Sequence, residues 1–225
     1  MKLTLYRGIS VDADHVAKVC DRICTNGIVE REPLTIQYIG LKHARLSNIR
    51  ALNPGHIDLR ENITSSNSWS FACGDREGAS FYAHRNYPKS PVLLRLSVDL
   101  KSVHIDGRDA LYTAFGFCRS GDKQRKESLI TTLFGKEILP YWEVAREIDS
   151  PSIRQNVAEA AAIDEAVILA HLSNKVPIFG RHKTRFCSAF AIRLPIPASS
   201  IKLVPVCDSW TGDVNHAELS ILAEQ

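Results

Sequence analysis

Two short polar motifs in the first third of the sequence carry residue types that bind phosphates and flat ligands. The first is Tyr6-Arg7-Gly8, which ends an apolar strand-like segment, and the second is Ser68-Trp69-Ser70. An arginine offers a planar fork of donors to a phosphate, and a glycine beside it lets the backbone approach a ligand closely. The two serine hydroxyls alternate onto one face of a predicted strand. These residues predict a site for a phosphorylated ligand with a planar group.

The residues after the serines have helical spacing. Ala79, Phe81, Tyr82 and Ala83 recur within the segment 75–83 in a pattern that favours a helix. A flat aromatic ring can pack on a planar ligand, so Phe81 or Tyr82 is a candidate for that contact.

The order and separation of the two motifs, with the Ala-x3-Ala helix behind them, resemble the ADP-ribosyltransferase superfamily, in its toxin-like branch with an arginine, a Ser-x-Ser and a late glutamate. The resemblance covers the first half of the chain well and the second half loosely. It implies an α+β fold with a split β-sandwich core and flanking helices, and NAD as the substrate. The segment 194–204 is similar to the proline turn that leads into the last strand of many bacterial members.

The resemblance also implies roles for single residues. Arg7 would bind the pyrophosphate or the nicotinamide ribose, Gly8 would pair through its backbone with the nicotinamide amide, and Ser68 would orient the catalytic carboxylate. The implied catalytic set is Arg7, Ser68 and Glu165. The implied NAD-binding set is Tyr6, Arg7, Gly8, Ser68, Ser70, Phe81 and Tyr82. No metal site is expected.

The catalytic glutamate of the pattern has more than one candidate in this sequence. Glu165 is the best candidate because the aliphatic run 166–169 follows it, as in a late strand of the family. Ile163 stands where the family has a glutamate or glutamine, which puts arginine and asparagine side-chain targets in doubt. The segment Ser152–Leu172 can also be drawn as one long helix. In that case Glu159, Glu143 or Glu137 become candidates, or the carboxylate role is absent; periodicity alone does not decide.

Three functions follow as expectations. The first is an NAD-dependent mono-ADP-ribosyltransferase acting on a protein or a nucleic acid, as a toxin or defence factor with an antidote or immunity partner. The second is an NAD glycohydrolase or phosphorylase, which Ile163 favours. The third is a binding module that keeps the fold without the chemistry. Plain structural roles also stay open: Arg7 in a surface salt bridge, and Ser68 and Ser70 on the outer face of an edge strand.

Composition predicts a soluble globular chain. The 225 residues are 44% hydrophobic and 24% charged, and a net charge of +3 is too small to indicate nucleic-acid binding by itself. No apolar run reaches the ~18–20 residues of a membrane span, and the N-terminal segment lacks a signal-peptide core, so we expect a cytoplasmic protein without membrane partners. The six cysteines are expected to be free thiols, although Cys20 and Cys24 share one face of a predicted helix and are candidates for two zinc ligands.

Elsewhere the pattern predicts one domain over residues 1–225, with strands at both ends and helices in the middle. Two basic clusters, 123–126 and 180–185, fall on predicted loops, and a nucleic-acid target follows if both flank the NAD site. The segment 119–126 is expected to be a flexible loop, and 30–62 an irregular connection. The remaining predicted elements are helices at 12–24, 127–148 and 151–172, and strands at 91–100, 103–106, 189–194 and 201–206.

Overall fold

A computed structural model describes residues 1–29, 69–86, 88–179, 185–208 and 215–224, and these residues form an α+β structure. The described part contains seven α-helices, a six-stranded antiparallel sheet and a two-stranded hairpin. It divides into two compact units. The first draws its described residues from Met1–Ile36, Asn67–Val103 and Pro177–His216, and the second from His104–Val176 and Ala217–Gln225. The single domain over residues 1–225 stays a prediction.

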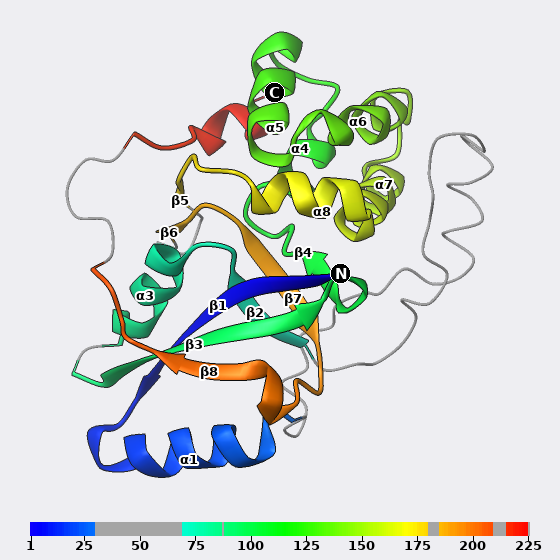
Figure 1. The fold of residues 1–225 in the computed structure, drawn as a ribbon. Coiled ribbons are helices and arrows are strands. Elements are labelled where there is room, and N and C mark those ends of the chain that lie inside the picture. Colours follow the sequence, from blue (N-terminus) through cyan, green and yellow to red (C-terminus); the bar gives the residue numbers. More distant parts are fainter. Residues whose placement is uncertain (30–68, 87, 180–184, 209–214, 225) are drawn as a thin grey trace. The chain divides into compact units, whose positions relative to one another are not determined.

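The sheet has the order β4-β7-β2-β1-β3-β8, and Figure 1 shows its long strands side by side with β8 at one edge. Strand β1 (Lys2–Val11) pairs with β3 (Ser90–Asp99) over its whole length, from Lys2 opposite Asp99 to Val11 opposite Ser90. The other strands are β2 (Trp69–Cys73), β4 (Val103–Ile105), β7 (Ala189–Arg193) and β8 (Ile201–Val204), and the hairpin is β5 (Ile178–Phe179) with β6 (Arg185–Phe186).

Alternating leucines explain why β1 and β3 form the centre of this sheet. Leu3 and Leu5 are buried on β1, and Leu94 and Leu96 are fully buried on β3. Side chains two apart on a strand share a face, so this alternation gives each strand one apolar face for the core.

Two helices of the first unit confirm the predicted pattern. Helix α1 (Val16–Asn26) follows a short 3₁₀ turn and ends at Gly27, whose φ of 76° suits glycine and whose N–H bonds to the carbonyl of Ile23. Helix α3 (Arg76–His84) starts after Asp75, which caps it.

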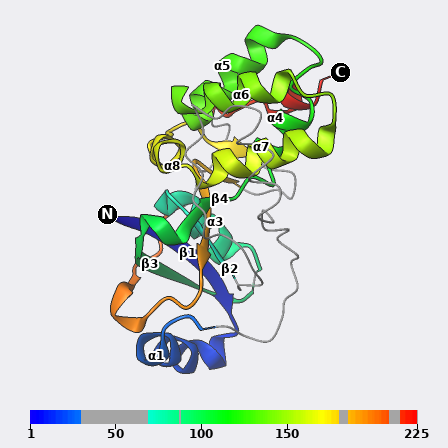
Figure 2. The ribbon, with the colours of Figure 1, turned by 90° about the vertical axis from the view of Figure 1, so that its right-hand side faces the viewer.

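The second unit is helical, and Figure 2 shows its helices gathered together. Phe115 and Trp142 meet edge to face in its core with ring centroids 5.6 Å apart, and both are fully buried. The helices are α4 (Leu111–Gly116), α5 (Lys123–Phe134), α6 (Leu139–Arg146), α7 (Pro151–Ile163) and α8 (Glu165–Leu172).

A buried arginine ties three segments of this unit together. Arg154 on α7 is 7% exposed, and its guanidinium donates to four carbonyls. Two of these, of Phe115 and Gly116, lie at the end of α4, and two, of Ile148 and Asp149, lie between α6 and α7. One side chain therefore satisfies carbonyls that the helix ends leave without helical partners.

The predicted loop at 119–126 is wrong in its second half. Asp122 accepts hydrogen bonds from the N–H groups of Gln124 and Arg125, so helix α5 begins at Lys123. Lys126 is fully buried, and its Nζ donates to the carbonyls of Phe117 at 2.9 Å and Glu224 at 2.7 Å. The basic cluster 123–126 is thus helical, and one of its cations is used inside the unit.

The other predicted elements have mixed outcomes. The helical middle is confirmed, with Gly135 ending α5 at a φ of 75°, while Pro140 lies in the first turn of α6 and does not break it. The last described element of the chain is a 3₁₀ turn, Leu219–Ala223. The irregular segment 30–62 and most of the basic cluster 180–185 lie outside the described residues.

All six cysteines are free thiols. Among the described residues, no helix has the length and apolarity that crossing a bilayer requires.

Candidate functional site

The first unit contains the Tyr6-Arg7-Gly8 motif at a place where two neighbouring strands part. Strands β1 and β2 share a single register pair, Tyr6 opposite Cys73, although β1 continues five residues further to Val11. Beyond that pair, Arg7 reaches across instead, and its Nη1 donates to the carbonyl of Phe71 at 2.6 Å. A side chain therefore replaces the backbone ladder between the two strands at this point.

Arg7 is a half-buried cation that lacks a carboxylate partner among the described residues. Burial lowers the pKa of its guanidinium from the ordinary value, because the charged form loses hydration. The carbonyl of Phe71 is its one hydrogen-bond acceptor within the described part of the chain. A guanidinium has five N–H donors, so most of its binding capacity is unused there. Such a group is suited to an anionic ligand.

Ser70 lies on the same face of the sheet as Arg7. Because Tyr6 is opposite Cys73 and side chains alternate, Ser70 and Ala72 share the face of Arg7. Ser70 is 3% exposed, and its Oγ has no hydrogen-bond partner in the described structure. Leaving a buried hydroxyl unsatisfied costs about 1–3 kcal/mol, which a ligand acceptor or donor would recover. Ser68 lies outside the described residues.

Gly8 has a packing role that sequence reasoning missed. A Cβ at this position would lie 1.8 Å from the carbonyl oxygen of Ala79 and 2.6 Å from the nitrogen of Ala83. Helix α3 therefore rests directly on the β1 backbone at Gly8, and Ser10 Oγ donates to the carbonyl of Ala83 at 2.8 Å beside it. The predicted contact of the Gly8 backbone with nicotinamide stays a prediction.

Phe81 and Tyr82 are carried by that helix, which covers the other face of β1. Gly8 and Ser10 point to α3, and Tyr6 shares their side of the strand, whereas Arg7 points to the opposite side. The Phe81 and Tyr82 rings meet edge to face at 6.3 Å, and the guanidinium of Arg185 lies 5.5 Å from the Phe81 ring centre. The structure thus brings Arg7 and Ser70 to one face and places Tyr6 and α3 on the other.

Asp75 is a structural residue that lies outside the two predicted motifs. Its carboxylate accepts from the N–H groups of Gly78 and Cys187, both at 2.6 Å, and of Ser188 at 3.2 Å. Burial raises the pKa of Asp75, because desolvation outweighs these hydrogen bonds. The carboxylate fixes the start of α3 to the residues that lead into β7. An aspartate directly before a helical run is the available sequence signal.

Glu165 lies in a helix, so the prediction that it opens a late strand is wrong. Helix α7 ends at Ile163, Asp164 caps α8 through the N–H groups of Ala166 and Val167, and Glu165 is exposed in the first turn of α8. Ser152–Leu172 is therefore two helices and not one. Glu137, Glu143 and Glu159 also belong to the second unit, whereas Arg7 and Ser70 belong to the first.

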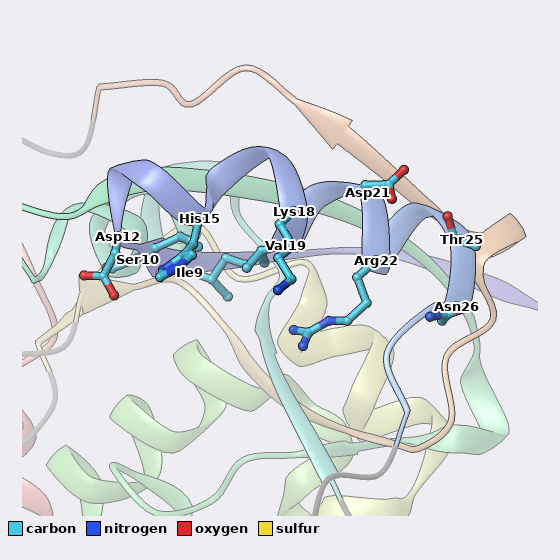
Figure 3. Close-up of a pocket in the computed structure, with 11 residues that line it drawn as sticks. Ile9, Ser10, Asp12, His15, Lys18, Val19, Asp21, Arg22, Thr25 and Asn26 are labelled. Carbon is cyan, nitrogen blue, oxygen red and sulfur yellow. The ribbon is translucent and has the colours of Figure 1, made fainter.

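A pocket of about 660 Å³ lies between the end of β1 and helix α1 in the first unit (Figure 3). Ile9 and Val11 line it, and both share the face of Arg7 on β1. The α1 side contributes Lys18 and Arg22. Its volume falls in the range of about 300–1,000 Å³ that is typical of small-molecule sites.

Among the described residues, no group of His, Cys, Asp and Glu side chains is arranged to hold a metal ion. The candidate site in the first unit consists of Arg7, Ser70 and the adjoining pocket. Comparisons with models of protein families, with curated proteins and with solved structures found no match to this chain.

Proposed function

We propose that this protein is an NAD-dependent mono-ADP-ribosyltransferase that modifies a protein or nucleic-acid target. The observation that carries the proposal is the pairing of Arg7 and Ser70 on one face of the sheet, where β1 and β2 part. Arg7 is a half-buried guanidinium without a carboxylate partner in the described structure, and Ser70 Oγ is buried without a hydrogen-bond partner there. Both groups offer unused hydrogen bonds to a polar, anionic ligand.

In the proposed reaction, Arg7 holds the pyrophosphate of NAD with its planar donor fork. The bond between nicotinamide and ribose breaks, and its electron pair leaves with the nicotinamide nitrogen. The ribose carbon becomes positively charged, as in glycoside hydrolysis, until an acceptor on the target attacks it. Ser70, on the same face of the sheet as Arg7, orients the ligand.

The finer fold expectation belongs to the same proposal. We take the antiparallel sheet that parts between β1 and β2 as one half of an ADP-ribosyltransferase-like split β-sandwich. Its support is the single register pair between these strands and the α+β architecture.

An NAD glycohydrolase is the second candidate, and Ile163 favours it. This residue stands two before Glu165, where the resembled family places a side chain that helps to choose the target. Ile163 is 3% exposed at the end of α7, so it offers no polar group to an acceptor.

The test is to incubate the purified protein with NAD and to follow free nicotinamide by chromatography, with and without cell lysate. Release that requires lysate, with label from adenine-labelled NAD on a macromolecule, supports the transferase. Release without lysate supports the glycohydrolase. A folded protein that releases no nicotinamide in either condition refutes both enzymes and favours the binding module.

Two pairs of variants connect the activity to the site. Arg7→Lys keeps the positive charge and loses the fork, so nicotinamide release should fall at least about 100-fold, whereas Arg95→Lys, at an exposed position of β3, should retain it. Glu165→Gln tests the carboxylate that the resemblance implies, and Glu147→Gln, at an exposed position of the same unit, is its control. Normal turnover by folded Arg7→Lys would refute the assignment.

A further inference from the structure

The pocket beside β1 contains a polar stripe that the proposed catalytic residues do not use. Figure 3 shows the side chains of His15, Lys18, Arg22 and Asn26 on the same side of helix α1 and the 3₁₀ turn before it, while Asp21 points away from them. Residues three or four apart are neighbours on a helix, so Lys18 and Arg22 are adjacent cations on α1.

The two cations are not neutralised within the described structure. Neither Lys18 nor Arg22 forms an ion pair or hydrogen bond there through its side chain. Asp12, the other acidic residue at the pocket, already pairs with Lys89 at 3.2 Å. The pocket therefore presents two unpaired positive charges side by side, flanked by two side chains that can form hydrogen bonds.

The chemistry of the stripe matches a diphosphate. Side chains four apart on a helix have Cβ atoms about 5–6 Å apart, which lets each cation bind one of two linked phosphates. Ile9, which lines the pocket, is two residues from Arg7 on the same face of β1, a step of about 7 Å. A ligand that fills the pocket and extends by this step along β1 would therefore reach Arg7 as well.

We infer that the pocket binds the diphosphate of the dinucleotide through Lys18 and Arg22. The inference rests on the proposed function, because it makes this pocket part of the NAD site. Lys18 and Arg22 then bind the two phosphates from the α1 side, and Arg7 contacts the same diphosphate from the side of the nicotinamide ribose. The remaining volume accepts the attached ribose and base.

The test measures binding of ADP-ribose and of inorganic pyrophosphate by titration calorimetry at two salt concentrations. In the variant with both Lys18→Gln and Arg22→Gln, the Kd for ADP-ribose should rise about 10- to 100-fold, with a weaker dependence on salt. The KM for NAD should rise by a similar factor with little change in kcat. The matched control combines Lys101→Gln and Lys202→Gln, two exposed lysines of the same unit, and should bind as the unchanged protein does.

Several outcomes would overturn the inference. Unchanged ADP-ribose binding by the Lys18 and Arg22 variant refutes it, even if Arg7→Lys abolishes nicotinamide release and the transferase proposal stands. Loss of binding to a single-stranded RNA of 20 nucleotides, with ADP-ribose binding intact, reassigns the stripe to nucleic acid. If ADP-ribose binds through Lys18 and Arg22 while the protein releases no nicotinamide, the diphosphate site stands and the transferase fails.

Discussion

His171 should make the second unit lose stability in mild acid. The side chain is 2% exposed on α8, its Nδ1 lies 2.8 Å from the carbonyl of Leu133, and its ring stacks on Phe134 with centroids 4.7 Å apart. A carbonyl only accepts, so Nδ1 carries the proton of the neutral ring and donates it. Burial lowers the pKa of His171 from 6.5 to about 4, because the charged ring would lose its hydration.

The size of the effect follows from the two pKa values. In the unfolded chain the ring takes up a proton near pH 6.5, whereas the folded ring stays neutral until about pH 4. Stability is therefore fully present above pH 6.5 and falls as the pH drops toward 4, because the unfolded state binds more protons. The loss attributable to His171 is about 2 kcal/mol at pH 5 and approaches about 3 kcal/mol at pH 4.

The assay compares urea unfolding of the unchanged protein and His171→Asn between pH 8 and pH 4. The asparagine amide can still donate to Leu133 but does not titrate in this range. Trp142 is fully buried in the same unit and reports on it by fluorescence, in a background where Trp69 and Trp210 are replaced by phenylalanine. The unfolding free energy of the unchanged protein should fall more steeply with acid than that of the variant.

Subtracting the unfolding free energy of His171→Asn from that of the unchanged protein at each pH cancels the contributions of the other groups that titrate over this range. His84→Asn is the matched control because His84 is exposed on α3. It should retain the steep dependence of the unchanged protein. Equal slopes for the unchanged protein and His171→Asn would refute the reasoning, since a buried neutral histidine must produce the difference.

Three further substitutions test the packing described above. Gly8→Ala should lower the unfolding free energy by about 3 kcal/mol or more in thermal or urea unfolding, because the new Cβ would lie 1.8 Å from the carbonyl oxygen of Ala79 on α3. A loss under 1 kcal/mol would contradict the close packing of α3 on β1. Asp75→Ala should lower the unfolding free energy by about 2–4 kcal/mol in the same measurement, because α3 loses its cap and the buried N–H groups of Cys187 and Ser188 lose their acceptor. A stability equal to that of the unchanged protein would contradict the burial of these two N–H groups. Arg154→Met should cost about 3–5 kcal/mol, measured by Trp142 fluorescence, because four carbonyls lose their donor, and an unchanged midpoint would show that water replaces it.

Short sequence patterns predicted the helices and strands that a glycine stop, an alanine pair or an alternation of apolar and polar residues marks. Gly27 stops α1, and the Ala79 and Ala83 pair marks the helix that rests on β1. Strand β3 was predicted almost to the residue, because its apolar and polar residues alternate. These elements depend on short-range patterns, so a single sequence contained enough information.

The errors arose where a distant partner decides the structure. The stretch around Lys126 is polar enough to predict a loop, but a carbonyl far along the chain accepts from its ammonium and allows its burial. Asp164 divides the segment around Glu165 because it caps α8 and also accepts from Tyr141 Oη at 2.6 Å. The opposite faces of Arg7 and Phe81 depend on pairing register, which the spacing of the motifs does not contain.

The buried ammonium of Lys126 has a consequence for how the protein is made. Its acceptor at Glu224 is 98 residues further along the chain, so a ribosome working at about 5–20 residues per second needs about 5–20 s to supply it. During that interval helix α5 is complete, but its cation has only the carbonyl of Phe117 as an acceptor. We therefore expect water to occupy the second hydrogen-bonding position of the Lys126 ammonium until the late segment has been synthesised.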